Sequence, residues 1–269
     1  MKVFLRDHAL IKVSGIDSES FLQSQFSNNV KEIQNNRIQI NAYCQHQGKI
    51  IAIIWVFKKN GIFYLSVTKN LKNVVLSKLN LFKMMSQVDI EDITGKFFQY
   101  GLISEQNEKS FKINNNLSLL ITEDLINEYD DNSLWEIVCI NDRIPEINFQ
   151  MSEKFTPQSL NLDVNEIGVS FNKGCYPGQE VVARMHYLGE PKRRLFRFTS
   201  QFEVSVGDNL NTNDSKSLKS SGQVIRVAKN DTEFQFLGVF EVGHINDKIF
   251  LNSDQTKLVY LIHDRLHLS

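Results

Sequence analysis

The chain has 269 residues, of which 42% are hydrophobic and 23% charged, and its formal net charge is −1 with a pI of about 6.6. These values are ordinary for a soluble globular protein of one or two domains. They disfavour a dedicated nonspecific nucleic-acid binder, which carries a marked basic excess. The longest apolar run, at 50–57, is far shorter than the roughly 20 residues that span a bilayer. Three separate cysteines without a CxxC pair predict reduced thiols. We therefore expect a cytoplasmic protein that does not contact membranes.

The N-terminal part of the chain predicts a short strand followed by a helix within residues 10–30. Asp17 is a favourable N-cap residue for that helix. Ile16 and Phe21 stand at the spacing of a hydrophobic staple, which would fix the direction in which the chain enters the helix.

Strand and turn signals dominate the next segment, 37–67. Its apolar runs are separated by Gln47-Gly48 and by Asn60-Gly61, and an Asn-Gly pair between two apolar runs is a strong hairpin signal. The spacing of apolar residues predicts three further elements, a helix over 69–87 and strands near 97–104 and 117–122.

The pattern changes again in the C-terminal half of the chain. Residues 132–147 predict a helix with Trp135 on its buried face, halted by Pro145. Further on, short alternating strands separated by polar turns predict a small β-barrel. The expected organisation is a mixed α/β region at 1–194 and a small C-terminal barrel domain at 195–269.

The residues richest in chemistry lie in NKGCYPGQEVVARMHYLGEPKRR, at 172–194. This stretch predicts a helix over 177–188, which places Cys175 just before a helix N-terminus, where unpaired N–H groups and the macrodipole favour a thiolate. Lys173 adds a positive charge of the kind that lowers a cysteine pKa below its usual value of about 8.5. From the residues alone, Cys175 is either a reactive thiol or a small residue packed in a turn.

The segment KGCYPGQEVVAR resembles the K-G-C-[FY]-x-G-Q-E-x-x-x-R signature of the YgfZ family, which comprises folate-binding relatives of the aminomethyltransferase, or T-protein, of the glycine cleavage system. GIDSESFLQSQ and CQHQGKI are similar to two earlier family segments, and IPEI, FTPQSLNL and GVSFNKGC follow in the expected order. The resemblance therefore covers nearly the whole chain. It implies an α+β, T-protein-like fold, with lobes around a central cavity that receives tetrahydrofolate and a small C-terminal β-barrel.

The resemblance also implies functional residues. YgfZ-like proteins support the assembly or repair of iron–sulfur enzymes, including enzymes that modify tRNA, and the signature cysteine, matched here by Cys175, is important for that role. Four further motif residues are candidates to act with it, namely Lys173, Gln179, Glu180 and Arg184. The candidate folate contacts are Trp135, which can stack on the pterin ring, His8, which replaces a second tryptophan of the family, and Tyr176 of the motif.

The chain departs from the aminomethyltransferases at one chemically important place. Those enzymes carry an aspartate just after the glycine of QGKIIAIIW, where this chain has Ile51 and Ala52. An aliphatic side chain can neither hydrogen-bond the reacting folate nitrogen nor stabilise a developing cation, so ordinary aminomethyl transfer is not expected. The predicted function is that of a folate-dependent factor for iron–sulfur proteins. The alternative is a folate-dependent one-carbon transferase or demethylase.

The expected partners are iron–sulfur enzymes or their assembly proteins. Direct tRNA binding through the basic run PKRR, at 191–194, is disfavoured by the near-neutral net charge. Cys44 and His46 offer two metal ligands without an obvious third, so no metal site is predicted.

Overall fold

The computed structural model describes residues 1–105, 107–126, 132–213 and 220–262, and the chain divides into two compact units. The first unit consists of Met1–Asn132, Ile147–Gln158 and Leu162–Glu190. The second consists of Ser133–Glu146, Ser159–Asn161 and Pro191–Ser269. The last piece of the second unit begins close to the expected boundary at 194, but this unit also takes up two earlier stretches of the chain.

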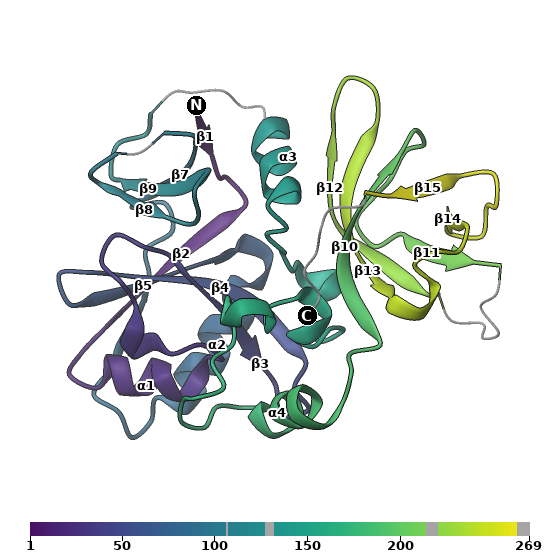
Figure 1. The fold of residues 1–269 in the computed structure, drawn as a ribbon. Helices are drawn as coiled ribbons and strands as arrows, with labels where there is room; N and C mark the ends of the chain where they lie inside the picture. Colours follow the sequence, from purple (N-terminus) through teal and green to yellow (C-terminus); the bar gives the residue numbers. More distant parts are fainter. Residues whose placement is uncertain (106, 127–131, 214–219, 263–269) are drawn as a thin grey trace. The chain divides into compact units, whose positions relative to one another are not determined.

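Two antiparallel sheets form the framework of the first unit (Figure 1). The five-stranded sheet has the order β3-β4-β5-β2-β6, with bounds Gln39–Cys44, Ile50–Lys59, Ile62–Thr68, His8–Ser14 and Asp89–Asp92. The four-stranded sheet has the order β1-β7-β9-β8, with bounds Lys2–Phe4, Phe98–Ile103, Leu117–Thr122 and Ser110–Lys112. The apolar run at 50–57 is buried along its whole length because β4 is an interior strand of its sheet.

The helices of the first unit are α1, Ser18–Gln25, α2, Lys72–Phe82, and α4, Gln179–Leu188. Short 3₁₀ turns occur in both units, at Val30–Glu32, Lys69–Leu71, Phe149–Met151, Gln158–Leu160, Val164–Glu166 and, in the second unit, Val242–His244. The predicted helix over 69–87 is confirmed in its central part, where Val75 and Leu79 are spaced i,i+4 and are both buried. Within the described ranges, no helix combines the length and the apolar character needed to cross a membrane.

The turn predictions near the N-terminus have mixed outcomes. Asn60 and Gly61 both take left-handed backbone conformations, with φ of 51° and 80°, as a type I′ hairpin turn requires, so the hairpin is confirmed. The hydrophobic staple is wrong, since Ile16 is 85% exposed. Asp17 precedes α1 as expected, but its carboxylate accepts a hydrogen bond from the N–H of Gln87 at 2.8 Å and does not cap the helix.

The second unit is built on a closed antiparallel barrel with the strand order β10-β13-β12-β11-β14-β15 (Figure 1). Its strands are Arg193–Ser200, Phe234–Glu241, Gly222–Lys229, Asn209–Thr212, Ile249–Leu251 and Leu258–Leu261. Phe198 and Phe236 are fully buried and stack with ring centroids 5.5 Å apart. The predicted barrel is therefore confirmed, and closure leaves no sheet edge unpaired.

Helix α3, Ser133–Asn141, belongs to the second unit because it packs along β12 (Figure 1). Arg226 of β12 is 3% exposed and donates from Nε and Nη2 to both carboxylate oxygens of Glu136, at 2.6 and 3.0 Å. Its Nη1 donates to the carbonyl of Ile144 at 3.0 Å. The helix ends before the predicted halt at Pro145. A buried ion pair formed over a long sequence separation thus assigns α3 to the barrel.

Candidate functional site

Cys175 lies in the turn that leads into α4. Gly178 occupies the N-cap position with a left-handed φ of 84°, so the helix starts later than the predicted position 177. The side chain of Cys175 is exposed, whereas Cys44 and Cys139 are buried. Burial raises the pKa of each of the two buried thiols to about 12. Cys175 is therefore the accessible thiol of the chain, and its interpretation as a packed core residue is excluded.

Lys173 anchors this turn to the first unit. Its side chain is 9% exposed, and Nζ donates to the carbonyls of Gln23 at 2.6 Å, Phe26 at 2.5 Å and Asn28 at 3.1 Å. These carbonyls lie at and just beyond the C-terminal end of α1, where unpaired carbonyls carry partial negative charge. Burial lowers the pKa of Lys173 to about 8, so the ammonium form still predominates at pH 7. The lysine thus joins the signature motif to the GIDSESFLQSQ segment, a contact that its sequence position did not indicate.

The buried side chain of Tyr176 is a second anchor of the turn that contains Cys175. Its side chain is 6% exposed, and the Nζ of Lys173 lies 5.2 Å from the centroid of its ring, within the range of a cation–π contact. Burial raises the pKa of the Tyr176 hydroxyl, and the neighbouring Cys44 acts in the same direction. Because the residues at 173 and 176 both point inward, Cys175 is held between two buried anchors while its own thiol is exposed.

A pocket of about 530 Å³ opens beside Cys175. It is lined by His46, Cys175, Tyr176, Pro177, Gly178, Gln179, Glu180 and Ala183. On α4, Oε1 of Glu180 accepts a hydrogen bond from Nη2 of Arg184, four residues further along the helix, at 2.9 Å. Both of these side chains are largely exposed, so the pair contributes only about 0.3–0.5 kcal/mol to stability. The structure therefore places Gln179 and Glu180 in the pocket beside Cys175, whereas Lys173 and Arg184 are not among the residues that line it.

The candidate folate contacts other than Tyr176 lie elsewhere. Trp135 belongs to α3 of the second unit and is 1% exposed. His8 belongs to β2 of the first unit, where its Nδ1 lies 3.1 Å from Oγ of Ser66 and its ring centroid 5.3 Å from that of Trp55. The structure does not bring either residue into the lining of the Cys175 pocket.

His46 lines the Cys175 pocket, although sequence reasoning gave it no role there. The sequence grouped His46 with Cys44 as a pair of metal ligands. Strand β3 ends at Cys44, whose side chain is buried, and the turn that follows leaves His46 exposed. Two residues two positions apart share a face only within a continuous strand, so the end of β3 separates them.

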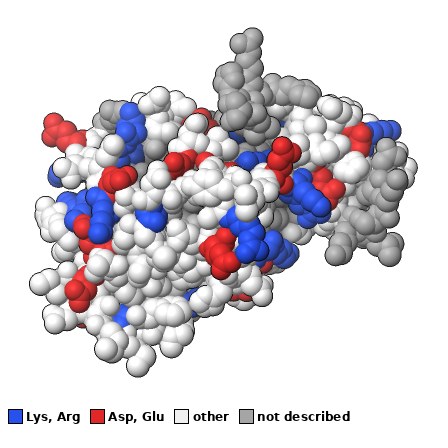
Figure 2. Space-filling view, turned by 60° about the horizontal axis from the view of Figure 1, so that its bottom comes forward, with Lys and Arg blue, Asp and Glu red and all other residues white. Residues whose placement is uncertain are grey.

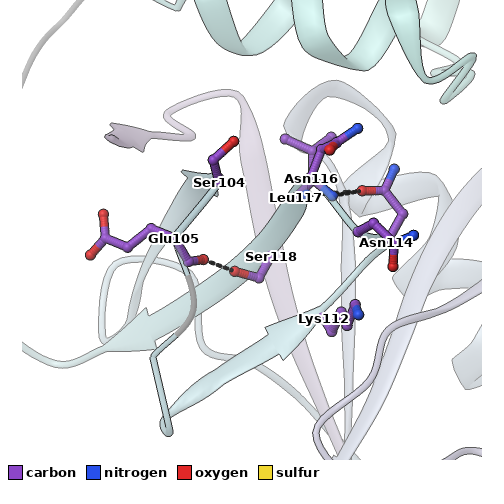
Figure 3. A pocket seen from close by; sticks show the side chains of 8 residues that line it. Ser104, Glu105, Lys112, Asn114, Asn116, Leu117 and Ser118 are labelled. Carbon is purple, nitrogen blue, oxygen red and sulfur yellow. Dashed lines mark hydrogen bonds between the residues drawn. The ribbon is translucent and has the colours of Figure 1, made fainter.

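A second, more polar pocket of about 340 Å³ lies at the ends of β7, β8 and β9 (Figure 3). Its lining consists of Ser104, Glu105, Lys112, Asn114, Asn115, Asn116, Leu117 and Ser118. Oδ1 of Asn114 accepts hydrogen bonds from the N–H groups of Asn116 and Leu117, and Oγ of Ser118 donates to the carbonyl of Glu105. The side chains of Asn114 and Ser118 are thus hydrogen-bonded to main-chain groups of nearby residues. No thiol or imidazole occurs among the described residues that line this pocket. The Cys175 pocket is therefore the candidate functional site.

Charges of both signs are intermixed on the face of the molecule drawn in Figure 2, where blue and red side chains lie beside one another between uncharged areas. Within the PKRR run, Arg193 donates to Oε1 of Glu241 at 2.8 Å and to the carbonyl of Ser220 at 2.9 Å. This part of the basic run is thus partly neutralised by a partner within the second unit.

Comparison with a solved structure identifies the class of fold. The chain is similar to the glycine cleavage system aminomethyltransferase T from Bartonella henselae, with a TM-score of 0.68 and 12% sequence identity over 98% of this chain and 85% of that one. The fold is therefore T-protein-like and α+β, with a small C-terminal β-barrel, as the resemblance implied.

Comparison with known sequences identifies the family. The chain matches none of the protein-family models with which it was compared. It is 32% identical over 244 residues to an uncharacterized protein of Haemophilus influenzae, with 85% of each chain covered. It is also 30% identical over 247 residues to the tRNA-modifying protein YgfZ of Vibrio atlanticus, with 78% of this chain and 76% of that one covered. The chain belongs to the YgfZ family.

Proposed function

We propose that this chain is a folate-dependent factor in tRNA modification, which acts by supporting the assembly or repair of iron–sulfur enzymes in the cytoplasm. The observation that carries the proposal is the exposed thiol of Cys175, held in an intact KGCYPGQE motif beside a pocket of about 530 Å³. The names of the relatives and the T-protein-like fold support the same assignment. The partners that we propose are iron–sulfur enzymes that modify tRNA or the proteins that assemble their clusters.

Tetrahydrofolate is the ligand that we propose, and the chemistry of several residues fits it. Trp135, His8 and Tyr176 offer flat rings for a pterin, which also carries N–H donors. Oε1 of Gln99 is buried and has no recorded hydrogen-bond partner in the described part of the chain. The main-chain carbonyl of Gln99 accepts a hydrogen bond from the N–H of Leu5, which precedes β2 in the chain. Because Trp135 is 1% exposed, stacking on it requires a local movement that uncovers the indole.

Aminomethyl transfer is a less suitable function for these residues. Ile51 and Ala52 are buried in β4, 2% and 0% exposed, and neither can exchange a proton with a folate nitrogen. We therefore propose that folate supports the work of Cys175 and that the chain lacks ordinary aminomethyltransferase activity. Formation of methylenetetrahydrofolate from an aminomethyl donor by the purified protein would establish the alternative function of a one-carbon transferase.

Replacing Cys175 with serine should abolish the cellular role and leave the fold intact, because the side chain is exposed and serine is close to isosteric. In cells that lack the native chain, we expect wild type to restore the activity of iron–sulfur enzymes that modify tRNA. The Cys175→Ser variant should leave that activity at the level of the deletion. The measurement is the content of the modified nucleosides in purified tRNA, with the variant's concentration and circular dichroism matched to wild type.

Glu153→Gln, at an exposed position on another segment of the first unit, is a matched control that should behave as wild type. Full restoration of tRNA modification by Cys175→Ser would remove the cysteine from the proposed function.

Replacing Trp135 with alanine should weaken the binding of tetrahydrofolate by about tenfold or more, since a lost stacking contact of about 0.5–1.5 kcal/mol adds to the lost burial of the pterin. The measurement is a calorimetric titration of the full chain under anaerobic conditions, with Trp135→Phe expected to retain part of the affinity. Leu134→Ala is the control, because Leu134 is the preceding residue of α3 and is 42% exposed. Equal affinities of wild type and a folded Trp135→Ala variant would exclude the indole as a folate contact.

A further inference from the structure

Five large apolar side chains are exposed together at the C-terminal end of α2. Leu81 and Phe82, the last two residues of the helix, are 63% and 47% exposed. Met84 and Met85, in the turn that follows, are 82% and 98% exposed, and Ile16 is 85% exposed. We call these five side chains the α2-end patch. Single exposed apolar residues are ordinary, but a contiguous group of them marks an interaction surface.

Main-chain contacts hold Ile16 beside this turn. The N–H of Gln87 donates to Oδ2 of Asp17 at 2.8 Å, and the N–H of Asp17 donates to the carbonyl of Gln87 at 3.4 Å. Gly15 has a left-handed φ of 113°, and a Cβ added to it would collide with the carbonyl oxygen of Gln87. The residues on both sides of Ile16 thus contact Gln87, which lies two positions after Met85. The five side chains therefore form one patch.

The unpaired charges beside the patch are mainly positive. Lys78 lies three and four residues before Leu81 and Phe82, so it shares a face of α2 with them, and Lys83 directly follows Phe82. No hydrogen bond or ion pair is recorded for either ammonium group within the described ranges. Asp89, at the start of β6, is an exposed carboxylate that likewise has no recorded partner there. A complementary partner therefore presents apolar side chains with carboxylates at their edge.

Helix α1 connects the patch to the site around Cys175. Ile16 lies two residues before the first residue of α1, and Lys173 of the motif turn donates to carbonyls at and just beyond the last residue of that helix. A helix rises about 1.5 Å per residue, so the eight residues of α1 separate the two ends by about 12 Å. An interface of standard size buries about 800 Å² on each partner, so one protein can cover the patch and reach Cys175.

The figures show this side of the first unit. Helices α1, α2 and α4 lie along its lower part in Figure 1. Figure 2, which brings this side forward, shows uncharged areas between the charged side chains. The α2-end patch and the α4 motif thus belong to one side of the same unit.

We propose that the α2-end patch is the docking surface for a client protein that binds through apolar side chains with carboxylates at their edge. The client is an iron–sulfur enzyme that modifies tRNA or a protein that assembles its cluster. The inference rests on the proposed function, which supplies this class of partner. Methionine side chains are flexible and polarisable, so a surface that contains two of them can adapt to more than one client.

Two other occupants fit the charges less well. In a two-fold dimer the patch would meet the same patch of a second copy, which would bring the lysines at positions 78 and 83 of both copies together. Basic segments that bind anionic membranes carry about four to eight Lys or Arg residues, and the patch has two beside it. A protein with carboxylates at the edge of its apolar contact is therefore the favoured occupant.

The test places a photo-cross-linking residue on the patch in living cells. In cells that lack the native chain, Met85 of the full-length protein is replaced by p-benzoylphenylalanine, and the adducts that form under light are identified by mass spectrometry. We expect adducts with iron–sulfur enzymes that modify tRNA or with proteins that assemble their clusters. The same replacement at Phe149, which is 62% exposed in the first unit but outside the patch, is the matched control and should give these adducts at about tenfold lower yield.

Reversing a charge beside the patch tests the complementarity. Addition of Lys83→Glu to the Met85 cross-linking variant should lower the yield of adducts by about threefold or more, because like charges then face one another. Lys109→Glu is the control, because Lys109 is exposed in the loop before β8 and should leave the yield unchanged. All of these positions are at least partly exposed, so the variants should fold, which circular dichroism verifies.

The inference is overturned if the Met85 variant forms no adducts, or if its yield equals that of the Phe149 variant. Adducts only with a second copy of the chain, with lipid, or with proteins that neither carry nor assemble iron–sulfur clusters would overturn it as well. The cellular test of Cys175→Ser is independent. Adducts with iron–sulfur proteins together with full tRNA modification by Cys175→Ser would keep the docking surface and reject the role of the thiol. Lost modification without such adducts would do the reverse.

Discussion

Replacing Lys173 with methionine is expected to lower the free energy of unfolding by about 3 kcal/mol, which is large for a single substitution. The reason is that the variant leaves three carbonyls, those of Gln23, Phe26 and Asn28, without the donor that they share in the folded protein. Methionine fills a similar volume, so the loss reflects unpaired carbonyls and little cavity formation. Urea unfolding followed by circular dichroism measures the effect.

Lys58→Met is the matched control for this prediction. The Nζ of Lys58 pairs with Glu19 at 2.9 Å and lies 4.7 Å from the ring centroid of Phe63, but the side chains of Lys58 and Glu19 are each more than a third exposed. A surface pair of this kind contributes up to about 1 kcal/mol, so the control should lose far less stability than Lys173→Met. Equal losses of unfolding free energy in the two variants would contradict the prediction. They would mean that the three carbonyls find other hydrogen-bond donors when Lys173 is removed.

The effect of Lys173→Met on the free energy of unfolding is expected to depend on pH. Burial lowers the pKa of Lys173 in the folded state to about 8, below the value of about 10.4 expected in the unfolded chain. Between these values the unfolded state binds more protons, so the stability of wild type rises with pH relative to Lys173→Met, and it is constant below about pH 7. We expect a rise on the order of 1–3 kcal/mol, measured as the difference between the two proteins from pH 7 to 10. A difference that falls with pH would contradict the lowered pKa.

Replacing Arg226 with methionine is expected to destabilise the second unit by about 3–5 kcal/mol, because it removes one partner of a buried ion pair and leaves the carboxylate of Glu136 without its guanidinium. Arg226 is 3% exposed and bonds both carboxylate oxygens of Glu136 as well as the carbonyl of Ile144. Burial acts to lower the pKa of Arg226, but its interactions with Cys139, Glu136 and Glu146 hold that pKa above its usual value, so the guanidinium stays charged. The measurement is thermal unfolding, in which the transition of the barrel unit should move to lower temperature.

Arg193→Met separates burial from charge in this experiment. Arg193 donates to Glu241 from the neighbouring strand β10, but the two side chains are 38% and 35% exposed. We expect a loss of up to about 1 kcal/mol, several times smaller than for Arg226→Met. If Glu136→Gln, which keeps the shape of the acceptor, were as stable as wild type while Arg226→Met remained strongly destabilised, the loss would come from the carbonyl of Ile144.

Local sequence signals predicted the elements but not the contacts that join them. The Asn60-Gly61 turn, the barrel strands and the position of Cys175 before α4 follow from turn chemistry and alternation, which act over a few residues. Strands β8 and β14 are only three residues each and are too short to show alternation. Their pairing depends on partners supplied by the rest of the fold.

The parts of the site that could not be predicted depend on distant segments. Lys173 was expected to add charge near Cys175, yet its ammonium bonds carbonyls about 150 positions earlier in the chain. His46 was considered only together with Cys44, and the end of β3 places these two residues in different environments. The position of α3 depends on the pair between Arg226 and Glu136, which no local pattern encodes.

The burial of two of the three thiols determines how the third would be recycled. If a client or an oxidant left a sulfur or oxygen atom on Cys175, the chain holds no second accessible cysteine that could attack the adduct, since Cys44 and Cys139 are both buried. The regenerating thiol must therefore arrive from another molecule. Under the proposed function, the chain would need a small-molecule or protein thiol after each modification of Cys175, so its activity would follow the supply of cellular thiols.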